Sequence, residues 1–476
     1  MHVTHRPPLP SPGDGSRRET AAVLGRFAPM IYGPTVLFAV GEGAVLPLLP
    51  VLASRLGADI AVAGLVASAL VVGQLVGNLP AGWAVARIGE RLSMAIALGI
   101  ALLGVAGALI APNIGVLMAS VLLIGLCAAV FGLARHSFMT TRVPIFYRAR
   151  ALSLLGGTFR LGMFVGPFIA AALLAIFGTE DAALWFFGIC LVATALLVLL
   201  GPDPETRIAA EESRSTETDA SAPRPTDARA AAGAEFGASD PEAVDPEAVN
   251  PAAVNPEAVD REDTGEAVTG SIPTSERIGV LRTMWRNRGV LARLGLAAAS
   301  LSSVRSARQL VMPLWGLSIG LDASTIALVV GISGAIDFAL FYVSGQIMDR
   351  FGRLWAVLPS MVLMGGGFLA LSVTHDLADA SMWFAAFAMV LAVGNGLSSG
   401  ILLTLGADVA PKSNPAPFLG SWRTLTDAGG AATPLLVSGV TAVWSIGGAV
   451  ALIGVVGLVG AAAFSRYVPR FVPRVR

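Results

Sequence analysis

Seven charged side chains fall within long apolar segments of this chain, where an ion is costly unless it faces protein or water. They are Glu42, Arg160, Arg305, Arg308, Asp337, Arg423 and Asp427, and their uncharged polar companions are Gln74, Asn78, Gln309 and Asn395. A buried carboxyl group can bind and release a proton, and a guanidinium group can bind an anion or a polar head group. All four histidines lie in tails or near helix ends, so proton coupling would require a carboxyl group.

The composition places most of the chain in a membrane, because 55% of the residues are hydrophobic and only 13% are charged. So few charges cannot cover a soluble protein of 476 residues. Twelve segments are long enough to cross a hydrocarbon core of about 30 Å as helices. These segments are 28–52, 61–86, 92–111, 114–135, 150–177, 181–201, 289–318, 323–348, 355–373, 381–407, 417–441 and 444–464. The two cysteines, Cys127 and Cys190, indicate neither a disulfide framework nor a metal site.

The two halves of the chain repeat each other. Residues 42–91 align without a gap with residues 305–354, at an offset of 263 residues, and the same offset places Gly166 on Gly429. A tandem duplication in so apolar a chain predicts an all-α membrane protein, with twelve transmembrane helices in two six-helix pseudo-symmetric halves. The functional site is then expected between the halves.

The repeat pairs Glu42 with Arg305 and Asp337 with Gln74. We interpret Glu42 and Asp337 as proton-coupling groups; for Asp337, a hydrogen bond between helices is the alternative. Opposite charges at paired positions are equally compatible with a switching pair and with a static salt bridge. Arg305 and Arg308 share one helix face, where they would either contact an anionic or polar substrate or, for Arg308, be neutralised by carbonyl groups or Asp337.

Arg160 and Arg423 are also repeat mates, each about 10–15 Å inside its helix end. We predict that both are anchors near a cytoplasmic gate. Asp427 follows Arg423 by four residues, so it either neutralises that arginine or serves as a third proton-coupling group. The predicted substrate-binding residues are Arg305, Arg308, Gln74, Gln309 and Asn395.

Basic residues are concentrated in alternate connections, so the positive-inside rule predicts that both termini are cytoplasmic. The predicted domains are a tail (1–25), the first half (26–201), a linker (202–280), the second half (281–466) and a second tail (467–476). The linker carries Pro-containing pentapeptide repeats such as Asp240–Val244. Proline at every fifth position blocks helix and sheet, so we expect a disordered cytoplasmic segment.

Residues 345–353, with the sequence GQIMDRFGR, resemble the signature loop G-x-x-x-D-R-x-G-R of the major facilitator superfamily. The counterpart at 82–91 is similar but has Ala86 in the acidic position. The signature residues are Gly82, Arg87, Gly89, Arg91, Gly345, Asp349, Arg350, Gly352 and Arg353. The resemblance implies a central cavity that opens alternately to each side and is lined by the first and seventh helices.

Within that family, the run of Gly162, Gly166 and Pro167 resembles the helix-five motif of the twelve-helix drug–proton antiporters. Those antiporters usually carry an Arg and a Gln ahead of a Gly in helix four, whereas Gly125 follows four apolar residues. The resemblance to this branch is therefore incomplete.

The sequence predicts a secondary active transporter in the cell membrane, working by alternating access. The predicted activity is proton-coupled efflux of a small hydrophobic or amphipathic compound. The alternatives are a proton-coupled transporter of organic anions or metabolites, and a non-transporting receptor or scaffold. We expect a monomer whose partners are a small-molecule substrate and the lipid bilayer, with no nucleic acid, no cofactor besides the proton gradient and no enzymatic activity.

Overall fold

The structure is a computed structural model that describes residues 31–142, 145–201, 285–411 and 415–472. The predicted N-terminal tail and linker, and the last four residues of the predicted C-terminal tail, lie outside the described residues. Helix α19 (Ile446–Phe471) continues into the segment predicted as the second tail.

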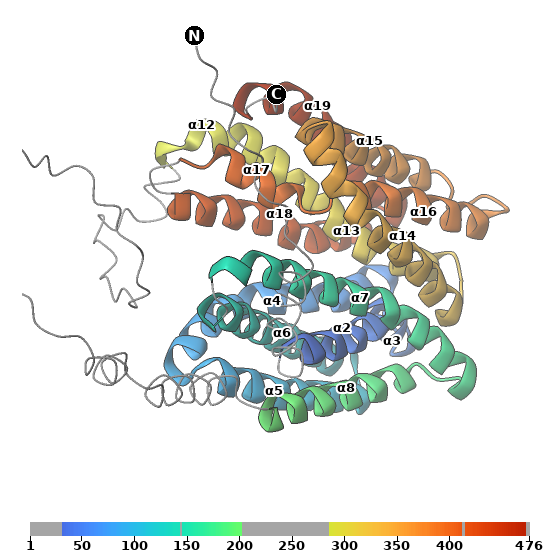
Figure 1. Cartoon of the computed structure of the whole chain (residues 1–476). Helices are drawn as coiled ribbons and strands as arrows, with labels where there is room; N and C mark the ends of the chain where they lie inside the picture. Colours follow the sequence, from blue (N-terminus) through green and yellow to red (C-terminus); the bar gives the residue numbers. More distant parts are fainter. Residues whose placement is uncertain (1–30, 143–144, 202–284, 412–414, 473–476) are drawn as a thin grey trace, which may run out of the picture. The chain divides into compact units, whose positions relative to one another are not determined.

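Every regular element of the described residues is helical, which confirms the predicted fold class (Figure 1). The first half contains α2 (Gly33–Val45), a 3-10 turn (Leu46–Leu48), α3 (Leu49–Arg55), α4 (Ile60–Ile88), α5 (Glu90–Leu109), α6 (Ile114–Arg142), α7 (Ile145–Phe177) and α8 (Asp181–Leu200). The second half contains α12 (Arg288–Val290), a π-helical turn (Leu291–Gly295), α13 (Leu296–Ser318), α14 (Ala323–Arg350), α15 (Arg353–Ser372), α16 (Ala380–Leu397), α17 (Ile401–Val409), α18 (Pro415–Val443) and α19.

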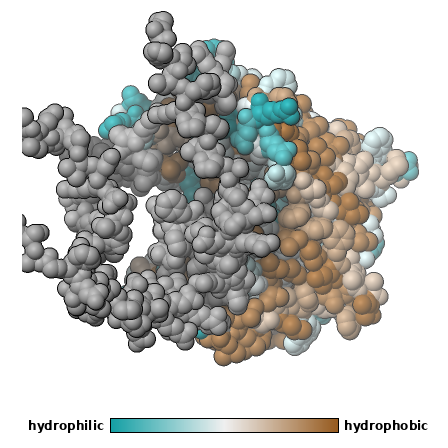
Figure 2. All heavy atoms as spheres, in the orientation of Figure 1, coloured by the Kyte–Doolittle hydropathy of each residue, from teal (hydrophilic) through white to brown (hydrophobic). Residues whose placement is uncertain are grey.

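These elements form twelve membrane-length helical segments within the described ranges, and ten of them combine the length and hydropathy of a membrane span. The other two are α13 and α18, which carry four of the seven charged residues singled out in the sequence. Large apolar side chains are exposed elsewhere on the outer surface, such as Leu103 and Ile110. Figure 2 shows hydrophobic residues over much of the visible helical surface, as expected for a surface that faces lipid.

The helices of each half pack in the same pattern. In the first half α2 packs against α7 and α8, α6 against α4 and α5, and α5 against α8. The second half repeats these five pairings: α13 packs against α18 and α19, α16 against α14 and α15, and α15 against α19. The halves meet where α7 packs on α14 and where α4 packs on α18. The repeat relates α7 to α18 and α4 to α14, so it converts each of these contacts into the other. This confirms the pseudo-symmetry.

Glycines permit the closest helix contacts in both halves. A Cβ atom on Gly166 of α7 would lie 2.5 Å from the carbonyl oxygen of Val40 in α2. On its repeat mate Gly429, a Cβ atom would lie 2.5 Å from the carbonyl oxygen of Ala299 in α13. Gly162 also faces α2, where a Cβ atom would lie 2.8 Å from the amide nitrogen of Val40. The helix-five motif therefore brings two backbones together.

Helix ten differs from the prediction of one continuous helix over 381–407. The structure ends α16 at Leu397 and begins α17 at Ile401, and Gly400 between them has a φ of +80°. This left-handed conformation cannot continue a right-handed helix and is readily adopted only by glycine. The prediction was wrong here because hydropathy does not distinguish a broken apolar helix from a continuous one. At the repeat mate of Gly400, Ser137, α6 remains helical.

Candidate functional site

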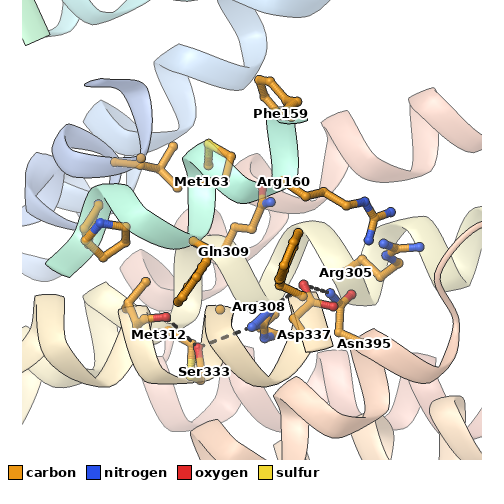
Figure 3. A pocket seen from close by; sticks show the side chains of 18 residues that line it. Phe159, Arg160, Met163, Arg305, Arg308, Gln309, Met312, Ser333, Asp337 and Asn395 are labelled. Atoms are coloured by element: carbon orange, nitrogen blue, oxygen red, sulfur yellow. Dashed lines mark hydrogen bonds and ion pairs between the residues drawn. The ribbon is translucent and has the colours of Figure 1, made fainter. Parts of the chain in front are cut away.

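A cavity of about 310 Å³ lies between the two halves (Figure 3). Helices α2 and α7 line it from the first half, and α13, α14 and α16 from the second. Its polar lining residues are Arg160, Arg305, Arg308, Gln309, Ser333, Asp337 and Asn395. The structure therefore brings together four of the five predicted substrate-binding residues, one predicted proton-coupling residue and one predicted gate residue.

Asp337 of α14 is at the centre of a buried polar cluster. Its Oδ2 atom accepts a hydrogen bond of 2.6 Å from Nδ2 of Asn395 and lies 3.8 Å from Nη1 of Arg308. Arg308 also donates from Nη2 to the hydroxyl of Ser333 at 3.3 Å. The Oδ1 atom of Asp337 and the Nε atom of Arg308 are buried and have no hydrogen-bond partner. The carboxyl group thus has one oxygen atom to which a proton could be added.

Two more guanidinium groups meet at the helix break. Arg160 of α7 donates from Nη1 to the hydroxyl of Ser399 at 2.9 Å, and its guanidinium carbon lies 4.5 Å from the ring centre of Phe341. Arg305 of α13 donates from Nη1 to the carbonyl oxygen of Ser398 at 3.4 Å. Among the described residues, neither arginine has a carboxylate within 4.0 Å. The cavity lining therefore has three cations and one carboxylate.

Apolar side chains form the rest of the cavity wall. Phe164 of the first half stacks on Phe338 of the second, with ring centres 5.8 Å apart. Phe159, Met163 and Met312 also line the cavity. The site consequently combines cationic groups with an aromatic surface, which suits an amphipathic anion.

A second polar cluster lies within the first half. The Glu42 side chain is buried, and its Oε1 atom accepts a hydrogen bond of 3.1 Å from Nε2 of Gln74. Neither residue lines the cavity, although both were predicted to act there. Glu42 and Arg305, paired by the repeat, form no ion pair in this structure, because Glu42 contacts Gln74 and Arg305 contacts Ser398.

The sequence prediction missed Arg135, which interacts electrostatically with Glu42. Its guanidinium carbon lies 4.8 Å from the ring centre of Phe159 and 5.6 Å from that of Phe131. Its Nε and Nη1 atoms are buried without a hydrogen-bond partner. The predicted helix ended at residue 135, whereas α6 continues to Arg142. The apolar pair Phe138–Met139 beyond Arg135 is the signal that would have placed this arginine inside the helix.

The predicted residues of α18 lie apart from the cavity lining. Nε of Arg423 is 3.5 Å from Oδ2 of Asp427, and these side chains are 72% and 53% exposed. Asp427 therefore forms an ion pair with Arg423, which agrees with the interpretation that it neutralises this arginine.

The signature loops join neighbouring helices within each half. Gly89 and Gly352 have φ values of +81° and +94° and form the turns before α5 and α15. Arg91 donates to carbonyl oxygens at the end of α8, with a bond of 2.8 Å to Val198, and Arg353 donates to Asp408 of α17 at 2.9 Å.

Other signature residues have few contacts. The side chain of Asp349 is 84% exposed and lies 3.8 Å from Nη1 of Arg353. Arg87 and Arg350 are exposed, and a Cβ atom on Gly82 or Gly345 would meet nothing within 4 Å.

Comparison with known proteins supports the fold and the family. The family model described as Major Facilitator Superfamily matches residues 34–434 and 310–476. A search of curated proteins finds no match.

Several solved structures are similar in fold. A POT family transporter in complex with a thioalcohol conjugated peptide has a TM-score of 0.66 and 11% identity, over 94% of this chain and 96% of that one. A POT family transporter in complex with 5-aminolevulinic acid has a TM-score of 0.67 and 12% identity, with the same coverage. A peptide transporter POT in complex with sulfate has a TM-score of 0.62 and 13% identity, over 96% and 99%. At this identity the likeness extends to the fold alone.

Proposed function

Because the chain belongs to the major facilitator superfamily and is thus a secondary transporter, we propose that its cargo is a small organic anion moved together with protons. The observation that carries this proposal is the excess of cations in the cavity lining, where Arg160, Arg305 and Arg308 face a single carboxyl group. Burying uncompensated charge is costly, so an anionic cargo would stabilise the occupied cavity. This was the second transport hypothesis drawn from the sequence.

Asp337 and Arg308 supply a route for coupling the cargo to protons. With Asp337 ionised, its carboxylate competes with an external anion for Arg308, 3.8 Å away. A proton added at Oδ1 removes that negative charge, and Arg308 then offers its full charge to the cargo. Anion and proton would bind together in this scheme and leave together after the halves rearrange. Glu42 is a further candidate for proton binding, acting from the first-half cluster.

The proposal includes a monomer whose two termini both lie in the cytoplasm. The ligands of similar solved structures are consistent with an anionic cargo. The similar solved structures include complexes with 5-aminolevulinic acid, an amino acid with one carboxyl group, and with sulfate, an inorganic anion. A coupled influx of anion and proton would make the protein an uptake system in a cell membrane with an inward proton gradient.

A second candidate function is proton-coupled efflux of a hydrophobic or amphipathic compound, as in the drug–proton antiporter branch. Its support is the apolar part of the cavity wall, with Phe159, Phe164 and Phe338, together with the helix-five motif. Under this alternative, uncharged or cationic aromatic compounds should be carried at least as well as anions.

The test is uptake into proteoliposomes with an imposed pH gradient, using radiolabelled benzenesulfonate and benzyltrimethylammonium as anionic and cationic aromatic probes. Both keep their charge at all working pH values and therefore do not cross the lipid as neutral species. We expect accumulation of benzenesulfonate driven by an inward proton gradient, above protein-free liposomes. Asp337→Asn should abolish this accumulation while retaining benzenesulfonate exchange in the absence of a gradient. Asp376→Asn is the matched control, because Asp376 lies outside the cavity with a side chain that is 98% exposed. Preferential transport of benzyltrimethylammonium would favour the efflux alternative.

A further inference from the structure

Arg160 and Arg305 come from opposite halves and converge on two consecutive residues, Ser399 and Ser398, at the break between α16 and α17. Figure 3 shows their side chains extending toward each other along one side of the cavity. The helix break makes this convergence possible, because it exposes a carbonyl group and a hydroxyl group that a continuous helix would direct elsewhere.

The electrostatics of this pair differ from those of Arg308. Arg308 has Asp337 as a counter-ion at 3.8 Å, whereas Arg160 and Arg305 contact only neutral oxygen atoms and the ring of Phe341. The two guanidinium groups are also close enough to repel each other. Asp337 is the one carboxylate that interacts electrostatically with both groups, but it lies beyond 4.0 Å from each and is already held by Arg308 and Asn395. One carboxylate shared among three guanidinium groups leaves the cavity with an excess of positive charge.

The aromatic pair Phe164 and Phe338 lines the same cavity as these cations, and Phe164 shares helix α7 with Arg160. Phe164 follows Arg160 by four residues on α7, so the two side chains share a helix face. Phe164 stacks on Phe338, which immediately follows Asp337 on α14. An acid group at the arginines would therefore leave a flat apolar body next to two phenyl rings.

We propose that the acid group of the cargo binds between Arg160 and Arg305, bridging the two halves, and that its planar apolar body lies against Phe164 and Phe338. This proposal rests on the proposed function and deepens it, because it names the cargo class as small aromatic or other planar acids with one anionic group. It also reassigns Arg160, predicted from sequence as a gate anchor, to direct contact with the cargo. Binding then replaces a repulsion between the halves with an attraction.

The first test uses the purified full-length protein in detergent, with thermal unfolding as the readout and benzoate as the probe. Benzoate should raise the unfolding temperature in a saturable manner, and benzamide, its neutral counterpart of the same shape, should not. Arg160→Gln and Arg305→Gln should each weaken the apparent benzoate affinity by about tenfold or more, because each removes a charge-assisted hydrogen bond. Arg423→Gln is the matched control, since this repeat mate of Arg160 pairs with Asp427 apart from the cavity lining. It should bind benzoate with the affinity of the unaltered protein.

A charge-reversal variant distinguishes loss of the binding site from a general folding defect. In Arg160→Glu the introduced carboxylate should pair with Arg305 and take the place of the ligand's acid group. This variant should therefore unfold at a higher temperature than the unaltered protein without benzoate, and should no longer respond to benzoate. A general folding defect would lower the unfolding temperature instead.

The outcomes separate this proposal from the proposed function. Equal benzoate affinity in the unaltered protein, Arg160→Gln and Arg305→Gln would overturn the bridging site, while anion transport would still be judged by the Asp337→Asn accumulation assay. A response to benzamide equal to that to benzoate would also overturn it. If both glutamine variants lose benzoate binding but the unaltered protein does not accumulate benzenesulfonate in proteoliposomes, the site is retained and the transport function is rejected.

Discussion

The two halves of this protein share their helix packing but differ in the polar groups that the packing positions. Gly166 and Gly429 are repeat mates that bring α7 onto α2 and α18 onto α13 at the same close distance. Yet the repeat places Glu42 opposite Arg305 and Gln74 opposite Asp337. Close contacts between backbones tolerate almost no change in volume, whereas side chains around a cavity can change without disturbing the helices.

The polar groups also differ in what surrounds them. The second-half cluster of Asp337, Arg308 and Asn395 lines the central cavity, where ligands have access. The first-half cluster of Glu42, Gln74 and Arg135 is absent from that lining, and the ring of Phe159, which does line the cavity, covers Arg135. Both halves therefore contribute to the cavity lining, and the first half holds in addition an ionic cluster that is closed off from it.

The largest expected effect comes from breaking the closed cluster. Arg135→Gln leaves Glu42 without its nearby cation and should destabilise the protein by about 3 kcal/mol. The measurement is reversible unfolding in mixed micelles. Adding Glu42→Gln should recover most of this loss, because the neutral amide introduced by that substitution needs no counter-ion. If the double variant were as unstable as Arg135→Gln alone, packing of the arginine rather than its charge would be responsible.

Next in size is the packing that both halves share. Gly166→Ala and Gly429→Ala each place a methyl group 2.5 Å from a backbone oxygen, so each should cost about 2 kcal/mol in the same unfolding assay. Gly366→Ala in α15 is the matched control, since its Cβ atom would meet nothing within 4 Å and alanine favours the helix. A large difference between the two main variants would show that the halves are packed less alike than their geometry indicates.

The helix break is the clearest backbone difference between the halves. Gly400→Ala imposes a side chain on a φ of +80° and should cost about 1 kcal/mol, because the nearest atom, 3.9 Å away, leaves room for the methyl group. The shift of Ser398 and Ser399 should in addition weaken benzoate binding. Ser137→Ala, at the repeat mate within continuous α6, should leave benzoate affinity unchanged. Equal benzoate affinity in Gly400→Ala and the unaltered protein would show that the break does not position the arginines.

The smallest effect is expected at the signature loop of the second half. Asp349→Asn removes a carboxylate that is 84% exposed and 3.8 Å from Arg353, so stability should change by less than about 0.5 kcal/mol. Asp408→Asn should cost more, since it removes the 2.9 Å contact with Arg353 from a largely buried pair. Comparable losses in the two variants would mean that Asp349 has a stronger partner in another state of the transport cycle.

The sequence alone determined the features that depend on local chemistry. Runs of apolar residues predicted the twelve spans, and the 263-residue offset predicted two like halves. The resemblance to the signature loop singled out Gly89 and Gly352, and both form turns with a positive φ. The motif Gly162–Gly166 marked a close helix contact. Each of these features can be predicted from the sequence, because hydropathy, backbone conformation and residue size act over a few neighbouring positions.

Only the tertiary structure decided which polar groups share a site. Six of the predicted polar site residues meet around one cavity, whereas Glu42 and Gln74 form a separate cluster with Arg135, and Asp427 pairs with Arg423 outside the cavity lining. These outcomes depend on how each helix is rotated about its own axis and which neighbour it faces. That rotation is fixed by packing summed along the whole helix, so a single charged residue in a hydropathy profile does not reveal its partner. The break at Gly400 was likewise decided by the tertiary structure. This glycine lies in an apolar run whose hydropathy predicts one continuous helix.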